Sequence, residues 1–225
     1  MKKFLEILKK CPLFFGIEDD NLLRMLNCLG ARIIEFQKKE IISQEGEKAN
    51  QIGILLSGSA QIIQYDLYGN KSLLANINSS DVFNEAFACA GVDALPISVI
   101  ATEASTAMFV DCAHILHTCS NNCGFHQTLI YNLMKDLALK TILFHQKIEV
   151  TSKRTTRDKL LAYLGMEAKK AKSNSFEIPF DRQQLADYLE VERSGLSAEI
   201  SKMRKEGILN SDKNQFELLL NFLSY

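Results

Sequence analysis

The stretch Asp181–Arg204, DRQQLADYLEVERSGLSAEISKMR, has the pattern of two short helices joined by a tight turn. In its first half, Leu185 and Leu189 lie one helical turn apart and predict a supporting helix with one buried side. The link Glu190–Glu192 is short, and its central Val191 can fill the space between two crossing helices. The stretch therefore resembles a helix-turn-helix.

The second half predicts a recognition helix. Its apolar residues recur at intervals of three or four and form one buried stripe, Leu196, Ile200 and Met203. Together with Arg182 in the first helix, the residues expected to contact DNA are Arg193, Ser194, Ser197, Ala198, Ser201 and Lys202. An arginine in the major groove can bind a guanine edge with two hydrogen bonds. A solvated face on an ordinary helical hairpin is the alternative.

A wing is predicted directly after this helix. Gly207 is a natural helix stop, and the segments Gly207–Asn210 and Phe216–Leu220 predict two strands around the polar turn Ser211–Gln215. Two strands packed behind a recognition helix make a winged helix-turn-helix.

The order of R-Q-x-L-A-D-Y-L, V-x-R-S-x-L-S and K-M-R-x-x-G-I-L resembles the C-terminal domain of the cyclic-AMP receptor and fumarate-nitrate regulator (Crp/Fnr) superfamily of bacterial transcription factors. The resemblance implies a homodimer that binds a two-fold symmetric site in double-stranded DNA, with RNA polymerase as a further partner if it is an activator. Two positions depart from the family pattern. Glu190 stands where a turn glycine is common, at a cost of about 1 kcal/mol if its φ is positive. Ala198 stands where many members have a second base-reading arginine.

Composition sets the class of protein. With 225 residues, 47% of them hydrophobic, the chain is long enough for one large or two small domains. A net charge of −1 does not by itself indicate a nucleic-acid partner. The sequence contains no apolar run of bilayer length and no convincing signal peptide, so we expect a cytoplasmic protein with no membrane partner. The six cysteines are not expected to form a disulfide scaffold.

The first half of the chain predicts a sensor domain. Helical spacing from Lys2 to Leu29 predicts short helices, and the pattern from Ala31 to Asp111 predicts seven or eight short strands, the segment DVFNEAF (81–87) among them. Such strands suggest a small antiparallel barrel or jelly roll. This resembles the double-stranded β-roll of the same superfamily, which is cyclic-nucleotide-binding-like. The expected fold class is therefore α+β.

One long helix is predicted over 125–150. One apolar stripe consists of Ile130, Leu133, Leu137, Thr141, Phe144 and Ile148, and a second face of Leu129, Leu139, Ile142 and Leu143. One face can pack on the roll and the other on the same helix of a second chain; a single buried helix in a monomer is the alternative. The predicted domains are the β-roll with its N-terminal helices (1–124), the dimerisation helix (125–150) and the winged helix-turn-helix (151–225).

The resemblance also implies an effector pocket, at Phe83, Glu85, Phe87 and Ser98. Glu85 matches the family glutamate, although a carboxylate that caps a turn explains it equally well. No arginine occurs between Arg32 and Arg154, and a phosphate buried without a cation loses hydration that nothing replaces. We therefore expect an effector other than cyclic AMP.

A segment rich in cysteine and histidine is the second candidate site: Cys112, His114, His117, Cys119, Cys123 and His126. These ligand types suit haem iron or another transition metal, while buried thiols and surface histidines explain them equally. Haem stays an open possibility. Two rival functions remain: a constitutive DNA-binding protein whose sensor has no ligand, and a barrel-type metalloenzyme. The enzyme is disfavoured because the predicted roll has no histidine before His114.

Overall fold

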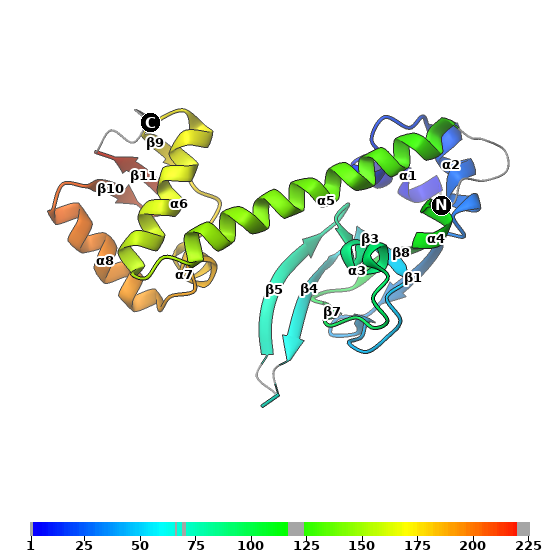
Figure 1. Ribbon diagram of the computed structural model, residues 1–225, viewed down its shortest axis with the longest axis horizontal. Helices are drawn as coiled ribbons and strands as arrows, with labels where there is room; N and C mark the ends of the chain where they lie inside the picture. Colours follow the sequence, from blue (N-terminus) through cyan, green and yellow to red (C-terminus); the bar gives the residue numbers. More distant parts are fainter. Residues whose placement is uncertain (1, 66, 69–70, 117–123, 220–225) are drawn as a thin grey trace. The chain divides into compact units, whose positions relative to one another are not determined.

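The computed structural model describes residues 2–65, 67–68, 71–116 and 124–219. The chain divides into two compact units, residues 1–139 and 140–225, and the helix α5 (Gly124–Thr151) extends across that division (Figure 1). None of the helices in the described ranges is long and apolar enough to span a bilayer. The predicted boundaries at 124/125 and 150/151 stay predictions.

The described part of the first unit contains two antiparallel sheets. Their strands are β1 (Arg32–Phe36), β2 (Ile41–Ser43), β3 (Gln51–Ser57), β4 (Ser59–Tyr65), β5 (Lys71–Asn78), β6 (Val82–Phe83), β7 (Ser98–Ala101) and β8 (Ser105–Asp111). One sheet has the order β1-β8-β3-β6 and the other β2-β7-β4-β5. This arrangement agrees with the predicted antiparallel roll.

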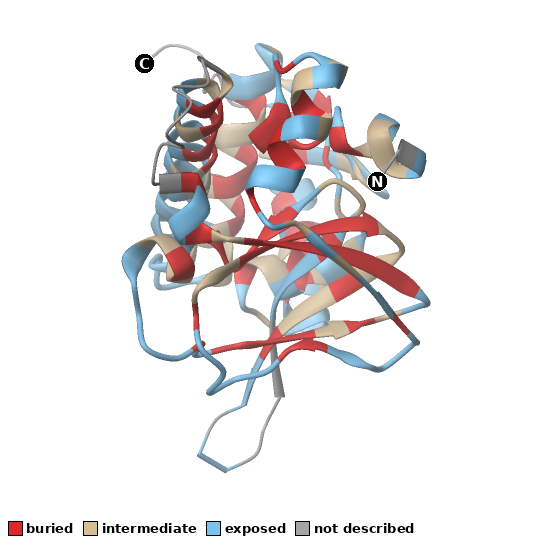
Figure 2. Ribbon diagram, turned by 90° about the vertical axis from the view of Figure 1, so that its right-hand side faces the viewer, coloured by how far each residue is buried: buried red, intermediate tan, exposed pale blue. Residues whose placement is uncertain are grey.

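Strands β3 and β8 are buried on both faces. Leu55 of β3 and Phe109 of β8 belong to an apolar cluster that also contains residues of the other sheet. Their neighbours Ile54 and Met108 belong to a second cluster, formed with the helices. Figure 2 shows long buried stretches in the strands. This double coverage explains why both strands are nearly continuous apolar runs rather than alternating ones.

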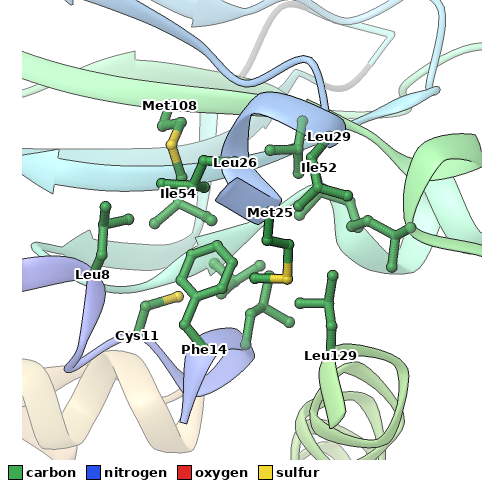
Figure 3. Packing of buried hydrophobic residues seen from close by; sticks show 14 of the residues in the cluster. Leu8, Cys11, Phe14, Met25, Leu26, Leu29, Ile52, Ile54, Met108 and Leu129 are labelled. Atoms are coloured by element: carbon green, nitrogen blue, oxygen red, sulfur yellow. The ribbon is translucent and has the colours of Figure 1, made fainter. Parts of the chain in front are cut away.

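Short helices supply the layer that covers the outer face of β3 and β8. They are η1 (Lys2–Phe4), α1 (Leu5–Leu8), η2 (Pro12–Phe14), α2 (Asp19–Cys28) and α4 (Cys112–Leu116). Figure 3 shows Phe14, Met25 and Leu26 packed against Ile54, with Leu129 of α5 in the same cluster. The N-terminal part of α5 thereby belongs to the core of the first unit.

A buried amide fixes α5 in this layer. Asn132, only 7% exposed, donates hydrogen bonds from Nδ2 to the carbonyl oxygens of Leu13 (3.0 Å) and Phe15 (2.8 Å). Both acceptors lie where η2 ends, so one side chain satisfies two backbone groups of a turn.

The predicted strand 81–87 is wrong in its second half. Only Val82 and Phe83 form a strand, and α3 (Glu85–Ala90) follows directly. The chain changes direction at Asn84, whose φ is +65°, a conformation that asparagine tolerates better than most residues. The Nδ2 group of Asn84 donates to Ser43 Oγ (3.0 Å).

Within the apolar run 51–57, Gly53 lies directly against the ring of Phe83. A Cβ atom on Gly53 would lie 2.1 Å from the ring of Phe83, which is buried against the strand. Gly53 and Phe83 are partners in the β3–β6 register. Glycine is therefore required here by the approach of the ring.

The second unit contains α6 (Thr156–Ala171), β9 (Ser175–Glu177), α7 (Arg182–Leu189), α8 (Arg193–Lys205), β10 (Leu209–Asp212) and β11 (Gln215–Leu218). Its strands form an antiparallel sheet of order β10-β11-β9. The predicted five-residue turn between the last two strands is too long: Asp212 pairs with Gln215, and the turn is Lys213–Asn214. Lys213 has a φ of +51°, as a two-residue hairpin turn requires.

The stripe predicted along the long helix divides in two. Leu133 is buried in the core of the first unit, with Ile130 and Leu137 partly buried there, whereas Phe144 and Ile148 of the same stripe are exposed. The row keeps the 3.6-residue period of an α-helix and so stays on one side of α5; it divides because only its first half packs against the core of the first unit.

Candidate functional site

The start of α7 is fixed by a capping box. Gln184 donates its backbone N–H to Asp181 Oδ1 (2.8 Å), and Asp181 donates its own N–H to Gln184 Oε1 (2.9 Å). Two of the free N–H groups at the helix end are thereby satisfied. The helix then buries Leu185 and Leu189, as the sequence predicts.

The turn between α7 and α8 contains the first of the two departures from the family pattern, Glu190. Glu190 has φ +54° and ψ +55°, the left-handed conformation that favours glycine. Lys159 of α6 supports the turn by donating Nζ to the carbonyl oxygens of Leu189 (3.0 Å) and Glu190 (3.3 Å). The side chain of Glu190 makes a partly exposed ion pair with Lys147 (3.8 Å).

Helix α8 has one buried and one open face. Leu196, Ile200 and Met203 are buried in the second unit. Of the residues predicted to contact DNA on this helix, all are exposed except Ser197, which is half-buried. Ser201 donates Oγ to the carbonyl oxygen of Ser197 (2.9 Å), so its hydroxyl oxygen is left to accept a hydrogen bond.

Arg193 is the first residue of α8. Its side chain is exposed and makes no hydrogen bond or ion pair with any residue in the described ranges. A guanidinium carries its donors in a planar fork that matches the acceptor edge of guanine. The geometry leaves this fork open to a ligand.

Arg182, in contrast, is held against the wing. It donates Nη2 to the carbonyl oxygen of Lys213 (3.3 Å), and its guanidinium carbon lies 5.5 Å from the centre of the Phe216 ring. Its Nη1 is buried with no hydrogen-bond partner in the described part of the chain. Burial, and then the charge of Arg193, lower the pKa of Arg182. An anion beside these two cations would relieve both effects.

Ion pairs join α6 to the end of α8. Arg157 pairs with Glu206 and, at 3.5 Å, with Glu199. The hydrogen bond from Arg157 lowers the pKa of the Glu206 carboxyl. Arg157 and Lys159 therefore already have partners within the protein, whereas Lys153, Arg154 and Lys169 are exposed. The sequence alone does not show which basic residues have such partners and which are exposed.

In the first unit, the residues predicted for an effector pocket have structural contacts. Phe83 packs on Gly53, and Ser98 accepts a hydrogen bond at Oγ from the backbone N–H of Glu45 (3.0 Å). Glu85 is buried in the first turn of α3, and Phe87 is half-buried. Their role in binding an effector stays a prediction.

A pocket of about 640 Å³ lies beside α3, and none of those four residues lines it. Its walls come from the β2–β3 loop, the end of α3 and the junction of β8 with α4. Polar and charged residues face it, namely Lys48, Asn50, Asp93 and Asp111, and two cysteines, Cys89 and Cys112, share it. The sequence does not indicate that Cys89 lies beside Cys112, because two residues 23 positions apart form no recognisable spacing pattern.

The predicted cysteine and histidine cluster is described only in part, since His117, Cys119 and Cys123 lie outside the described residues. Cys112 contacts Cys89 instead, with the two Sγ atoms 3.5 Å apart. The ring atoms His114 Nδ1 and His126 Nε2 lie 3.4 Å and 3.3 Å from the carbonyl oxygens of Leu29 and His114. Within the described ranges, no three cysteine, histidine or carboxylate side chains gather as metal ligands would.

Two family models match the chain. One, described as a cyclic nucleotide-binding domain, matches residues 33–122, and the other, described as a Crp-like helix-turn-helix domain, matches residues 158–220. The chain belongs to the Crp/Fnr superfamily of transcription regulators. The predicted fold class and DNA-binding module are thereby confirmed. The comparison with curated protein sequences gives no match.

Solved structures of this superfamily share the fold. CprK in complex with OCPA has a TM-score of 0.67 at 13% identity, over 88% of this chain and 91% of that one. CLP from Xanthomonas campestris has a TM-score of 0.57 at 13% identity, over 87% and 98%. DNR from Pseudomonas aeruginosa has a TM-score of 0.51 at 20% identity, over 98% and 96%. At these identities the likeness extends to the fold alone.

Proposed function

We propose that this Crp/Fnr-type regulator is a homodimer that reads a two-fold symmetric DNA site and responds to an effector other than cyclic AMP. The observation that carries the DNA-reading part is the open face of α8, where Arg193 projects from the first turn without a partner in the described ranges. In a dimer, two such helices would enter successive major grooves about 34 Å apart.

Arg182 supports this assignment from the wing side. Its buried Nη1 has no partner in the described part of the chain, and its charge lies close enough to Arg193 to lower its pKa. A phosphate oxygen placed between them would accept the free N–H and offset the repulsion between the two cations. In this scheme Arg182 binds the backbone, and Arg193 reads a base.

The exposed apolar surface of α5 supports dimerisation. Seven large apolar side chains on this helix are 51–65% exposed: Tyr131, Met134, Leu139, Ile142, Leu143, Phe144 and Ile148. A monomer that left these side chains in water would lose the free energy of burying them. An identical α5 packed against this one would cover those on the shared side in both chains, since a two-fold axis pairs a surface with itself.

The effector part rests on charge. No arginine lies between Arg32 and Arg154, and the described wall of the pocket beside α3 carries one cation, Lys48, and two carboxylates, Asp93 and Asp111. This balance disfavours a cyclic phosphate. Among the relatives, CLP is described as responsive to c-di-GMP and CprK is bound to OCPA. An effector would act by binding one of two arrangements of the regulator more tightly.

The DNA-reading part is tested with Arg193→Ala. Binding sites are first selected from random duplexes with the wild-type chain, and affinities are then measured at fixed salt by fluorescence anisotropy. We expect a loss of about 1–3 kcal/mol that is confined to one base position in each half-site. Lys202→Ala is the matched control, because a lysine that binds phosphate lowers affinity equally on all sequences. An equal loss on every sequence for Arg193→Ala would refute base reading.

The dimer is tested by sedimentation equilibrium of Ile142→Glu against Ile142→Leu. A charge among the exposed apolar side chains of α5 should convert the dimer to a monomer, whereas leucine should leave it intact. A wild-type chain that is monomeric at micromolar concentration, or a dimer unaffected by Ile142→Glu, would contradict the proposed interface.

A further inference from the structure

Two free thiols meet in the pocket beside α3. Cys89 is the fifth residue of α3 and Cys112 the first residue of α4, so they come from elements separated by 23 positions in the sequence. Their Sγ atoms are 3.5 Å apart. Both side chains line the pocket of about 640 Å³, so both are within reach of a small molecule that enters it.

We propose that Cys89 and Cys112 form a reversible disulfide when a peroxide such as hydrogen peroxide reaches this pocket. The bond would be a modification site within the first unit, joining α3 to the junction of β8 with α4. It shares Cys112 with the predicted metal cluster, but its second thiol, Cys89, does not belong to that cluster.

The geometry needs only a small adjustment. A disulfide bond is about 2 Å long, so the two sulfur atoms must approach by about 1.5 Å from their present separation of 3.5 Å. Helix α3 has only six residues and ends at Gly91, whose φ is +65° and beside which no atom would contact a Cβ within 4 Å. Cys89 lies one turn or less from this unobstructed end, where a short helix deforms most easily.

The reaction balances with one peroxide. One cysteine, as thiolate, attacks a peroxide oxygen; the O–O bond breaks, and the departing hydroxide takes up the proton of that thiol as water. The sulfenic sulfur is then attacked by the second cysteine: the S–S bond forms, the S–O bond breaks, and the hydroxide leaves as water with the second proton. Two thiols are oxidised and one peroxide is reduced to two waters.

The other two cysteines in the described ranges are Cys11 and Cys28. Cys11 is buried in the core of the first unit, and Cys28 is exposed at the end of α2. Cys28 serves as the internal comparison, because it is exposed to the same oxidant and contacts no second sulfur atom among the described residues. If the chain has the proposed function, this disulfide would make the first unit respond to an oxidant. The test of the disulfide does not depend on DNA binding.

The test uses the full chain with Cys119 and Cys123 replaced by serine, so that only described cysteines remain. The reduced protein is treated with one equivalent of hydrogen peroxide, its free thiols are alkylated, and it is cleaved after glutamate. Glu103 lies between Cys89 and Cys112, so the two peptides separate unless a disulfide joins them. Mass spectrometry then measures the linked pair.

We expect the Cys89–Cys112 pair to be linked in most molecules, to separate with dithiothreitol, and to be absent from Cys89→Ser and Cys112→Ser. Linkage should persist in Cys28→Ser. The proposal is overturned if the wild-type cysteines remain alkylated as separate thiols, or are oxidised singly to sulfinic acid. Phenylarsine oxide provides a second measurement without oxidation: one equivalent should bridge the pair in unmodified protein, and failure to block both thiols together would also overturn it.

Discussion

Replacing Glu190 with glycine should stabilise the second unit, although glycine destabilises the interior of a helix relative to alanine. Glu190 has φ +54° and ψ +55° in the turn between α7 and α8. An L-residue in this region costs about 1–2 kcal/mol. Glycine adopts it without that cost, but an unfolded chain with an additional glycine gains conformational freedom that offsets about 0.4–1 kcal/mol.

Loss of the ion pair between Glu190 and Lys147 changes the expected stability of the glycine variant only slightly. The nitrogen and oxygen are 3.8 Å apart, and the side chains are 38% and 60% exposed, so solvent screens the pair and its loss costs a few tenths of a kcal/mol at most, about 0.3. Alanine at 190 loses the same pair but keeps the left-handed backbone. The comparison of glycine with alanine therefore cancels the ion pair, and glycine should be more stable by about 0.5–1 kcal/mol.

Amide hydrogen exchange of the intact protein measures this difference. Exchange in α7 and α8 should be about two- to fivefold slower in Glu190→Gly than in Glu190→Ala. Helix α2, in the first unit, is the control region and should exchange equally in both variants. Faster exchange in the glycine variant than in the alanine variant would refute the argument, because it would mean that the turn is not strained at Glu190.

Gly53→Ala should destabilise the protein by about 1–3 kcal/mol, because the new Cβ would lie 2.1 Å from the Phe83 ring. Gly165→Ala in α6 should instead stabilise the protein by up to about 1 kcal/mol, because nothing lies within 4 Å of its Cβ position. Urea unfolding of both variants measures the two changes in stability. The pKa of Glu206 is lowered by its hydrogen bond to Arg157, so this pair stabilises the fold above pH 4.5 and the effect is lost as the pH falls through the lowered pKa. Glu206→Gln should therefore be less stable than wild type at pH 7 and equal to it well below pH 4.5; a difference that stayed constant with pH would contradict the assignment.

The winged helix-turn-helix was predictable because its information is local. The spacing of Leu196, Ile200 and Met203 predicts which face of α8 is buried, and Asp181 with Gln184 forms a capping pair within four residues. Helix periodicity and caps depend on neighbours in the sequence, so they can be read without the tertiary structure.

The first unit was harder because its decisive contacts are long-range. The strand predicted over 81–87 ends at Phe83, where the chain reverses at Asn84 toward Ser43. The apolar row of the long helix divides because its first half meets the helices of residues 2–28, which no local pattern shows. The contact between Cys89 and Cys112 likewise exists only after the sheets have formed.

The two hydrogen bonds from Asn132 to Leu13 and Phe15 have a mechanical consequence. A slide of α5 by one helical turn, about 5.4 Å, would break both at once and leave a buried amide without acceptors. The beginning of α5 and the turn at residues 12–15 must therefore travel as one rigid body. The Asn132 amide therefore opposes a shift of α5 along its own axis. The part of α5 held in this way ends near Leu137, beyond which most side chains of the helix are exposed.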